Sequence, residues 1–101
     1  MAFQVWTIDV GLAVSGELDM AAADGFRELA ASVLDPTGEV VLDIGDLAFI
    51  DSAGLRAIMR LSEDVCPHGI VLRSPRDNVL RVLEMLSIEN IAGIRVERRA
   101  P

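Results

Sequence analysis

The sequence predicts a single α/β domain built on a small mixed β-sheet. Short apolar runs rich in β-branched residues alternate with longer stretches in which apolar residues recur at helical spacing. Strands separated by helices favour parallel pairing, with right-handed crossovers and helices packed against the sheet. A chain of 101 residues can bury one core but has little room for a second domain. We therefore expect one domain over residues 1–97 and a frayed tail over 98–101.

The first part of the chain predicts a β-hairpin followed by a helix. Residues 3–8 alternate along a strand pattern, residues 9–11 supply a turn, and residues 12–16 form a second strand pattern. Asp19 is a good N-cap, because its carboxylate can accept hydrogen bonds from the free N–H groups of the first helical turn. An apolar stripe at helical spacing then comprises Phe26, Leu29, Ala30, Val33 and Leu34.

The rest of the chain predicts three more strands and two more helices. The expected strands are residues 39–44, 70–73 and 94–97, the first two being apolar enough for burial on both faces. Residues 45–50 are expected to be a connector, after which a helix begins near Ser52. Ser74 as N-cap and Pro75 at the first helical position predict the start of the last helix.

Charge and composition disfavour several classes of function. The net charge is −7 and lysine is absent, so binding to phosphate backbones or to anionic membrane surfaces is not expected. One cysteine, Cys66, allows no intrachain disulfide. The N-terminal segment has no basic region or long apolar stretch that would indicate a signal peptide. We therefore expect a cytoplasmic protein without direct membrane contact.

The segment AFIDSAGLRAI, residues 48–58, is the candidate functional site. In one interpretation Ser52 is simply the N-cap of the helix that follows, which is favoured for any single serine in this position. In the other its hydroxyl accepts a phosphoryl group, since a helix N-terminus favours negative charge. Asp51 is then either an ordinary first-turn acid or a charge that increases the electrostatic difference between the phosphorylated and the unphosphorylated chain.

Catalysis by Ser52 is a third interpretation, which the sequence disfavours. The segment resembles the G-x-S-x-G elbow of hydrolases, but Ile50 replaces the first glycine. The single histidine, His68, is expected in a turn beyond the helix, about 20 Å or more from Ser52. Cys66 and His68 have no partner pair for a metal, and phosphate-binding motifs are absent. We expect no catalytic residue, no metal and no cofactor.

Three segments together resemble the STAS domain family. They are residues 15–23, with Gly-Glu-Leu-Asp ahead of a helix, residues 40–61, with Asp-Ser-x-Gly-Leu at a helix start, and residues 68–88. The resemblance implies a STAS-like fold, a small mixed β-sheet with about three helices packed on it. Two features depart from the family pattern. Many members have Ser or Thr where this chain has Ala53, and many continue into a further C-terminal helix.

The resemblance also implies a function, because stand-alone STAS proteins of this size are typically anti-sigma factor antagonists. Such a protein, when unphosphorylated, binds an anti-sigma factor that is also a GHKL-type serine kinase, and the sigma factor is released. Phosphorylation of the serine that matches Ser52 ends binding, and a metal-dependent Ser/Thr phosphatase resets it. This would be a bacterial-type phosphoprotein that regulates transcription by partner switching in a stress response. The expected partner-binding residues are Asp19, Asp51, Ser52, Gly54, Leu55 and Arg56.

Two of these residues have physical interpretations of their own, and a second function stays open. Gly54 lacks a Cβ, which could let a partner backbone approach the serine, or it is a tolerated first-turn glycine. Arg56 either faces a partner or is a solvated helix residue. The alternative function is a non-enzymatic STAS subunit of an ABC lipid transporter or of a stress-signalling assembly, in which Ser52 need not carry phosphate.

Overall fold

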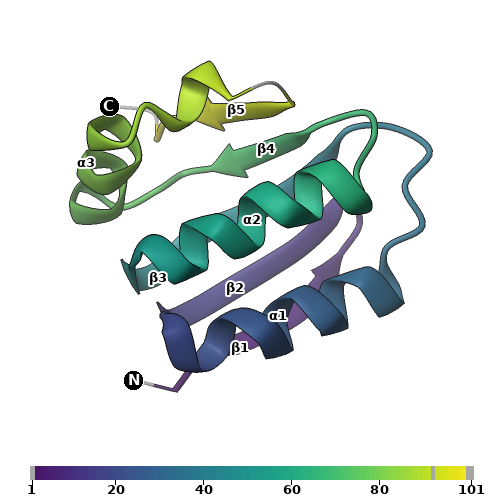
Figure 1. Ribbon diagram of the computed structural model, residues 1–101, viewed down its shortest axis with the longest axis horizontal. Helices are drawn as coiled ribbons and strands as arrows, with labels where there is room; N and C mark the ends of the chain where they lie inside the picture. Colours follow the sequence, from purple (N-terminus) through teal and green to yellow (C-terminus); the bar gives the residue numbers. More distant parts are fainter. Residues whose placement is uncertain (1, 92, 100–101) are drawn as a thin grey trace.

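The computed structural model, which describes residues 2–91 and 93–99, contains a five-stranded sheet with two long helices side by side on one face (Figure 1). The elements, in chain order, are β1 (Gln4–Ile8), β2 (Gly11–Leu18), α1 (Met20–Val33), β3 (Val40–Ile50), α2 (Ser52–Asp64), β4 (Ile70–Arg73), α3 (Asp77–Met85), the 3₁₀ turn η1 (Ile88–Asn90) and β5 (Ile94–Glu97).

The strands lie in the sheet in chain order, β1-β2-β3-β4-β5. The β1–β2 hairpin is antiparallel, and each later strand pairs in parallel with the one before it. This confirms the predicted α/β class with a mixed sheet. Because each parallel strand is added on the same side, right-handed crossovers bring the connecting helices to one face of the sheet. Within the described residues, no helix is long and apolar enough to cross a membrane.

The core between the sheet and the helices is mainly aliphatic. Phe26 is its aromatic member, and its ring contacts that of the partly buried Phe3 edge-on, with 6.0 Å between centroids. The apolar stripe predicted on α1 is narrower than expected. Phe26 and Ala30 are buried, but Leu29 and Val33 are 41 % and 45 % exposed. Ala23 is the third buried residue of α1, so its contact face combines one large and two small side chains.

The connector predicted at residues 45–50 is wrong, because β3 continues as one strand to Ile50. Gly45 and Asp46 are residue types common in turns, yet they lie inside this strand. In the structure, pairing with β2 continues past them through two register shifts and ends at the Leu18–Ile50 pair. The pairing with β4 stops at Asp43. Beyond it α3 lies beside β3, and the side chain of Asn78 donates to the Ala48 carbonyl at 2.8 Å.

The predicted start of the last helix at Ser74 and Pro75 is also wrong, since α3 begins at Asp77. Ser74 has a left-handed φ of 60°, and its N–H donates to the Glu97 carbonyl at 2.7 Å, so it belongs to the end of the β4–β5 pairing. Two tail residues have contacts: Arg98 pairs with Glu89 at 3.1 Å, and Arg99 donates to the Ser74 carbonyl at 3.0 Å. Fraying over 98–101 stays a prediction, and residues 100–101 lie outside the described part.

Candidate functional site

The candidate site lies where β2 and β3 end and where α1 and α2 begin (Figure 1). The two strands are parallel neighbours that end together at Leu18 and Ile50. Asp19 and Asp51 follow these strands directly, so two acidic residues and two helix N-termini come together at one edge of the sheet. Ligand sites in open parallel sheets form at this same edge, beyond the carboxyl ends of the strands.

The carboxylate of Asp51 connects the two helix starts. Its Oδ1 accepts a hydrogen bond from the Gly54 N–H at 2.9 Å, which makes Asp51 the N-cap of α2. Its Oδ2 accepts from the N–H of Met20, the first residue of α1, at 3.1 Å. Asp19 caps its own helix as predicted, because its Oδ1 accepts from the Ala22 N–H at 3.1 Å. The Asp51 carboxylate thus satisfies two N–H groups at helix starts, where backbone donors lack intrahelical partners. The Ala22 N–H donates to the backbone carbonyl of Asp19 as well, at 3.1 Å.

Ser52 is therefore not the N-cap of α2, and that interpretation is wrong. It is the first residue of the helix, its side chain is exposed, and its hydroxyl forms no hydrogen bond with any other residue in the described part of the chain. Serine and aspartate are about equally good N-caps, so residue preference alone does not distinguish Asp51 from Ser52. The structure assigns the role to Asp51, which leaves the Ser52 hydroxyl available for other chemistry.

Gly54 and Leu55 pack the start of α2 against the rest of the domain. A Cβ on Gly54 would lie 2.2 Å from the carbonyl oxygen of Leu18 and 2.9 Å from its Cγ. Glycine is thus required at position 54, rather than merely tolerated, because α2 begins in close contact with the end of β2. The direction in which a Cβ would project faces Leu18 of this chain and not a partner. Leu55 is only 3 % exposed and packs in the core. Both residues position Ser52 without offering much surface of their own.

Arg56 is exposed and lies between two hollows. One, of about 300 Å³, is also lined by Ser52 and by Leu86 after α3. The other, of about 280 Å³, lies between α1 and α2 and is also lined by Met20. Met20 and Leu86 are 79 % and 54 % exposed, and the sequence analysis did not single them out. Met20 could have been noticed, because it follows the N-cap Asp19 directly and lies outside the apolar stripe of its helix.

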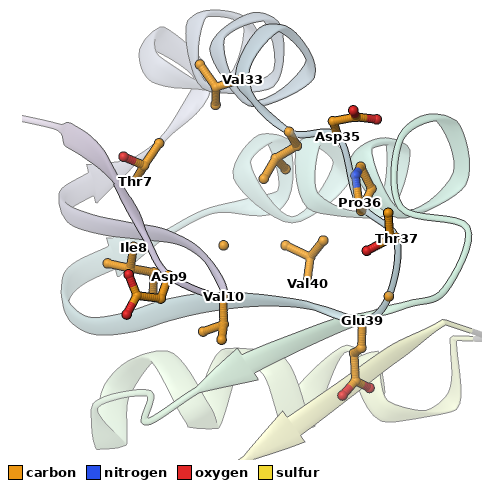
Figure 2. Close-up of a pocket in the computed structure, with 13 residues that line it drawn as sticks. Thr7, Ile8, Asp9, Val10, Val33, Asp35, Pro36, Thr37, Glu39 and Val40 are labelled. Carbon is orange, nitrogen blue, oxygen red and sulfur yellow. The ribbon is translucent and has the colours of Figure 1, made fainter.

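A wider hollow, of about 530 Å³, opens between the β1–β2 turn and the loop from α1 to β3 (Figure 2). Its lining includes the carboxylates Asp9, Asp35 and Glu39, and Glu39 pairs with Arg95 at 2.9 Å. The hollow lies at the amino end of β3, opposite Asp51 and Ser52, and contains none of the predicted site residues. It is therefore separate from the candidate site.

The structure also places the residues that were considered for catalysis. His68 lies in the turn beyond α2, so the length of that helix, about 20 Å, separates it from Ser52. His68 cannot act as the base for Ser52 at that distance. Cys66 is buried, and burial raises the pKa of its thiol, which keeps it protonated and unreactive near neutral pH. Among the described residues no group of three His, Cys, Asp or Glu side chains could hold a metal ion.

The fold and site together define a class of protein. It is a small mixed-sheet α/β domain in which neighbouring parallel strands lead into two helices and an exposed serine begins the second helix. A family model described as "Mlab, STAS domain" matches residues 2–95. The chain belongs to the STAS domain family, as its sequence resemblance predicted.

Two solved structures have a similar fold. The anti-sigma factor antagonist SpoIIAA, in its unphosphorylated form, superposes with a TM-score of 0.65 at 16 % identity, over 98 % of this chain and 90 % of that one. A candidate anti-sigma factor antagonist from Thermotoga maritima superposes with a TM-score of 0.75 at 21 % identity, over 96 % of this chain and 86 % of that one. At these identities the similarity shows the fold and not the function.

Proposed function

We propose that this chain is an anti-sigma factor antagonist whose binding to an anti-sigma factor is switched off by phosphorylation of Ser52. The observation that carries the proposal is the exposed Ser52 hydroxyl, which is free because Asp51 caps the helix in its place. A kinase can reach this hydroxyl without uncapping α2. The switch therefore requires no change in the fold of this domain.

The chemistry of the site suits a change in charge. A phosphate on Ser52 would add about −1.5 to −2 charge at pH 7 at a helix N-terminus, where the dipole favours it. Asp51 and Asp19 are already nearby at the starts of the two helices. A partner surface that accepts two carboxylates and a neutral hydroxyl would then face a much larger negative charge. Repulsion and lost contacts would release the partner.

The roles of the partners follow from the family resemblance. The anti-sigma factor would be a GHKL-type serine kinase that supplies ATP and the phosphoryl-transfer chemistry, and a metal-dependent Ser/Thr phosphatase would restore Ser52. The chain itself would be a cytoplasmic, non-enzymatic regulator of transcription. Asp19, Asp51, Ser52 and Arg56 would meet the partner, while Gly54 and Leu55 would hold the start of α2 in place.

Phosphopeptide mass spectrometry on the chain isolated from its own cells, unstressed and stressed, tests the switch. We expect phosphate on Ser52 with an occupancy that changes with condition. In binding assays with the co-purifying kinase, Ser52→Ala should bind like the unmodified chain and Ser52→Asp should bind more weakly. Ser32→Asp is a matched control, since it adds the same charge in the last turn of α1. Equal weakening by both aspartate variants would contradict the proposal.

A second candidate is a permanent STAS subunit of an ABC lipid transporter or of a stress-signalling assembly. The exposed apolar side chains of Met20 and Leu86, which line the two hollows beside Arg56, favour it, because apolar surface is typical of lasting interfaces. Co-purification with a transporter ATPase, together with a Ser52 that is never modified, would select this candidate and overturn the switch.

A further inference from the structure

Three unpaired arginines line the groove between α1 and α2. They are Arg27 from α1 and Arg56 and Arg60 from α2, and the groove has a volume of about 280 Å³. None of the three forms an ion pair or side-chain hydrogen bond with another residue in the described part of the chain. Asp24 is the one carboxylate among the described lining residues, so cations outnumber it three to one.

This concentration of free positive charge is unusual for the molecule. The whole chain has a net charge of −7. Arginines elsewhere are mostly engaged: Arg73 pairs with Asp43 at 3.0 Å, and Arg95 pairs with Glu39 at 2.9 Å. The groove is therefore a local cationic surface on an acidic protein. Such a surface attracts a negatively charged partner and repels a positively charged one.

The shape of the groove suits a segment of another protein. Besides the three arginines, Met20 and Asp24, its lining consists of the small residues Ala23, Ala53 and Ala57, which leave space between the two helices. Figure 1 shows these helices running side by side across the face of the sheet. A helix that docks in a groove contacts it with side chains at i, i+3, i+4 and i+7 spacing along one face.

We propose that the α1–α2 groove is the docking surface for an acidic segment of the partner protein, one that presents Glu or Asp side chains to Arg27, Arg56 and Arg60. Charge complementarity selects this occupant, because the groove is the cationic part of an acidic chain. A nucleic acid is disfavoured, since the rest of the surface would repel its phosphates. The identity of the partner as an anti-sigma factor rests on the proposed function, but the groove and its charge do not.

Arg56 connects the groove to Ser52. It lines the groove and also the hollow that Ser52 lines, and the two residues are four positions apart on α2, where side chains are neighbours. A phosphate on Ser52 would attract the Arg56 guanidinium and add negative charge at the end of the groove. The acidic segment would lose one cation and meet a repelling group. Phosphorylation would thus weaken docking in the groove as well as at the serine.

The test is an NMR titration of the full, unphosphorylated chain with two synthetic helical peptides of equal length. One carries glutamates at i, i+3, i+4 and i+7, and the other carries lysines at the same positions. We expect the glutamate peptide to bind with shifts at α1 and α2, more weakly at 300 mM than at 50 mM salt, and the lysine peptide not to bind. Arg27→Glu and Arg60→Glu should each weaken binding about three- to tenfold.

Arg81→Glu on α3 is the matched control, because it makes the same charge change at an exposed, unpaired arginine outside the groove. Less than a twofold effect of Arg81→Glu supports the groove. Equal binding of both peptides, equal weakening by all three variants, or preferential binding of a single-stranded oligonucleotide overturns it.

Chain with phosphoserine at position 52 should bind the glutamate peptide at least threefold more weakly. If the phosphorylated chain binds the glutamate peptide with unchanged affinity, only the coupling between Ser52 and the groove is overturned. If Ser52 carries no phosphate in cells, only the proposed function is contradicted.

Discussion

At the scale of single residues, Gly54 shows how closely the start of α2 packs on the sheet. Its missing Cβ would lie 2.2 Å from the Leu18 carbonyl oxygen, a backbone atom that cannot rotate away. We expect Gly54→Ala to lower the free energy of unfolding by about 1–3 kcal/mol, as overpacking usually does. Urea denaturation measures this change.

Gly25 provides the control for that substitution. It lies within α1, and a Cβ there would meet nothing within 4 Å. Gly25→Ala should therefore stabilise the chain by about 0.5–1 kcal/mol, because alanine is the better helix former and costs less backbone entropy. If both substitutions changed the free energy of unfolding in the same direction, close packing of α2 against Leu18 would not explain the need for glycine at position 54.

Cys66 gives a second prediction at this scale. Its side chain is 1 % exposed, and burial raises the pKa of its thiol. The folded chain thus holds the proton more tightly than the unfolded chain. The resulting stability is fully present below the unfolded pKa, about 8.5, and is lost as the pH rises towards the folded pKa.

The measurement for Cys66 is urea unfolding between pH 8 and pH 10.5. The chain has no lysine and no tyrosine, so few other side chains titrate in this range. We expect stability to fall with pH in the unmodified chain and to fall less in Cys66→Ala. Iodoacetamide should also label the native thiol far more slowly than the thiol in urea. Rapid labelling of the folded protein would show that the thiol is accessible.

At the scale of the elements, Asp51 organises two helices while Ser52 organises neither. The Asp51 carboxylate accepts from Gly54 in α2 and from Met20 in α1. Asp51→Ala should therefore cost about 1–2 kcal/mol of stability, as the loss of a good N-cap does. Ser52→Ala should change stability by less than about 0.5 kcal/mol, because its hydroxyl has no structural partner in the described chain. Equal destabilisation by the two variants in urea denaturation would contradict this division of roles.

Local patterns predicted the elements that depend on local chemistry. The hairpin, the Asp19 cap and the short strands 70–73 and 94–97 follow from alternation, short apolar runs, capping preference and turn residues, and the structure confirms them. The extension of β3 through Gly45 and Asp46 could not be predicted this way. It depends on pairing with β2, which is distant in sequence and overrides the turn preference of those residues.

The sequence predicted where Asp19, Asp51 and Ser52 lie in the fold, but not which side chain caps α2. The sequence places Asp19, Asp51 and Ser52 at helix starts, and parallel pairing of β2 with β3 brings those starts together. Which side chain caps α2 depends on the direction from which the chain enters the helix. The Met20 N–H contact of Asp51 joins residues 31 positions apart, which no local pattern shows. The arginine groove was missed for the same reason, because its arginines come from two helices.

At the scale of the whole molecule, positive and negative charge are distributed unequally. The α1–α2 groove collects unpaired arginines, while the hollow at the opposite end of β3 carries Asp9 and Asp35 without partners in the described chain. The molecule is compact, with a radius of gyration of 12.0 Å and a net charge of −7. At low ionic strength such a charge opposes folding by self-repulsion, and salt relieves it within a Debye length of about 10 Å at 0.1 M.

Surface ion pairs act in the opposite direction, because salt weakens them. Each of the exposed pairs, such as that of Arg95 with Glu39, contributes only about 0–1 kcal/mol, so we expect the net repulsion to dominate. The melting temperature should therefore rise between 10 mM and 150 mM sodium chloride. The double variant Asp9→Asn, Asp35→Asn should melt higher than the unmodified chain at 10 mM and show a smaller increase with salt. A melting temperature that falls as salt is added would mean that the ion pairs outweigh the repulsion among the carboxylates, and would contradict the prediction.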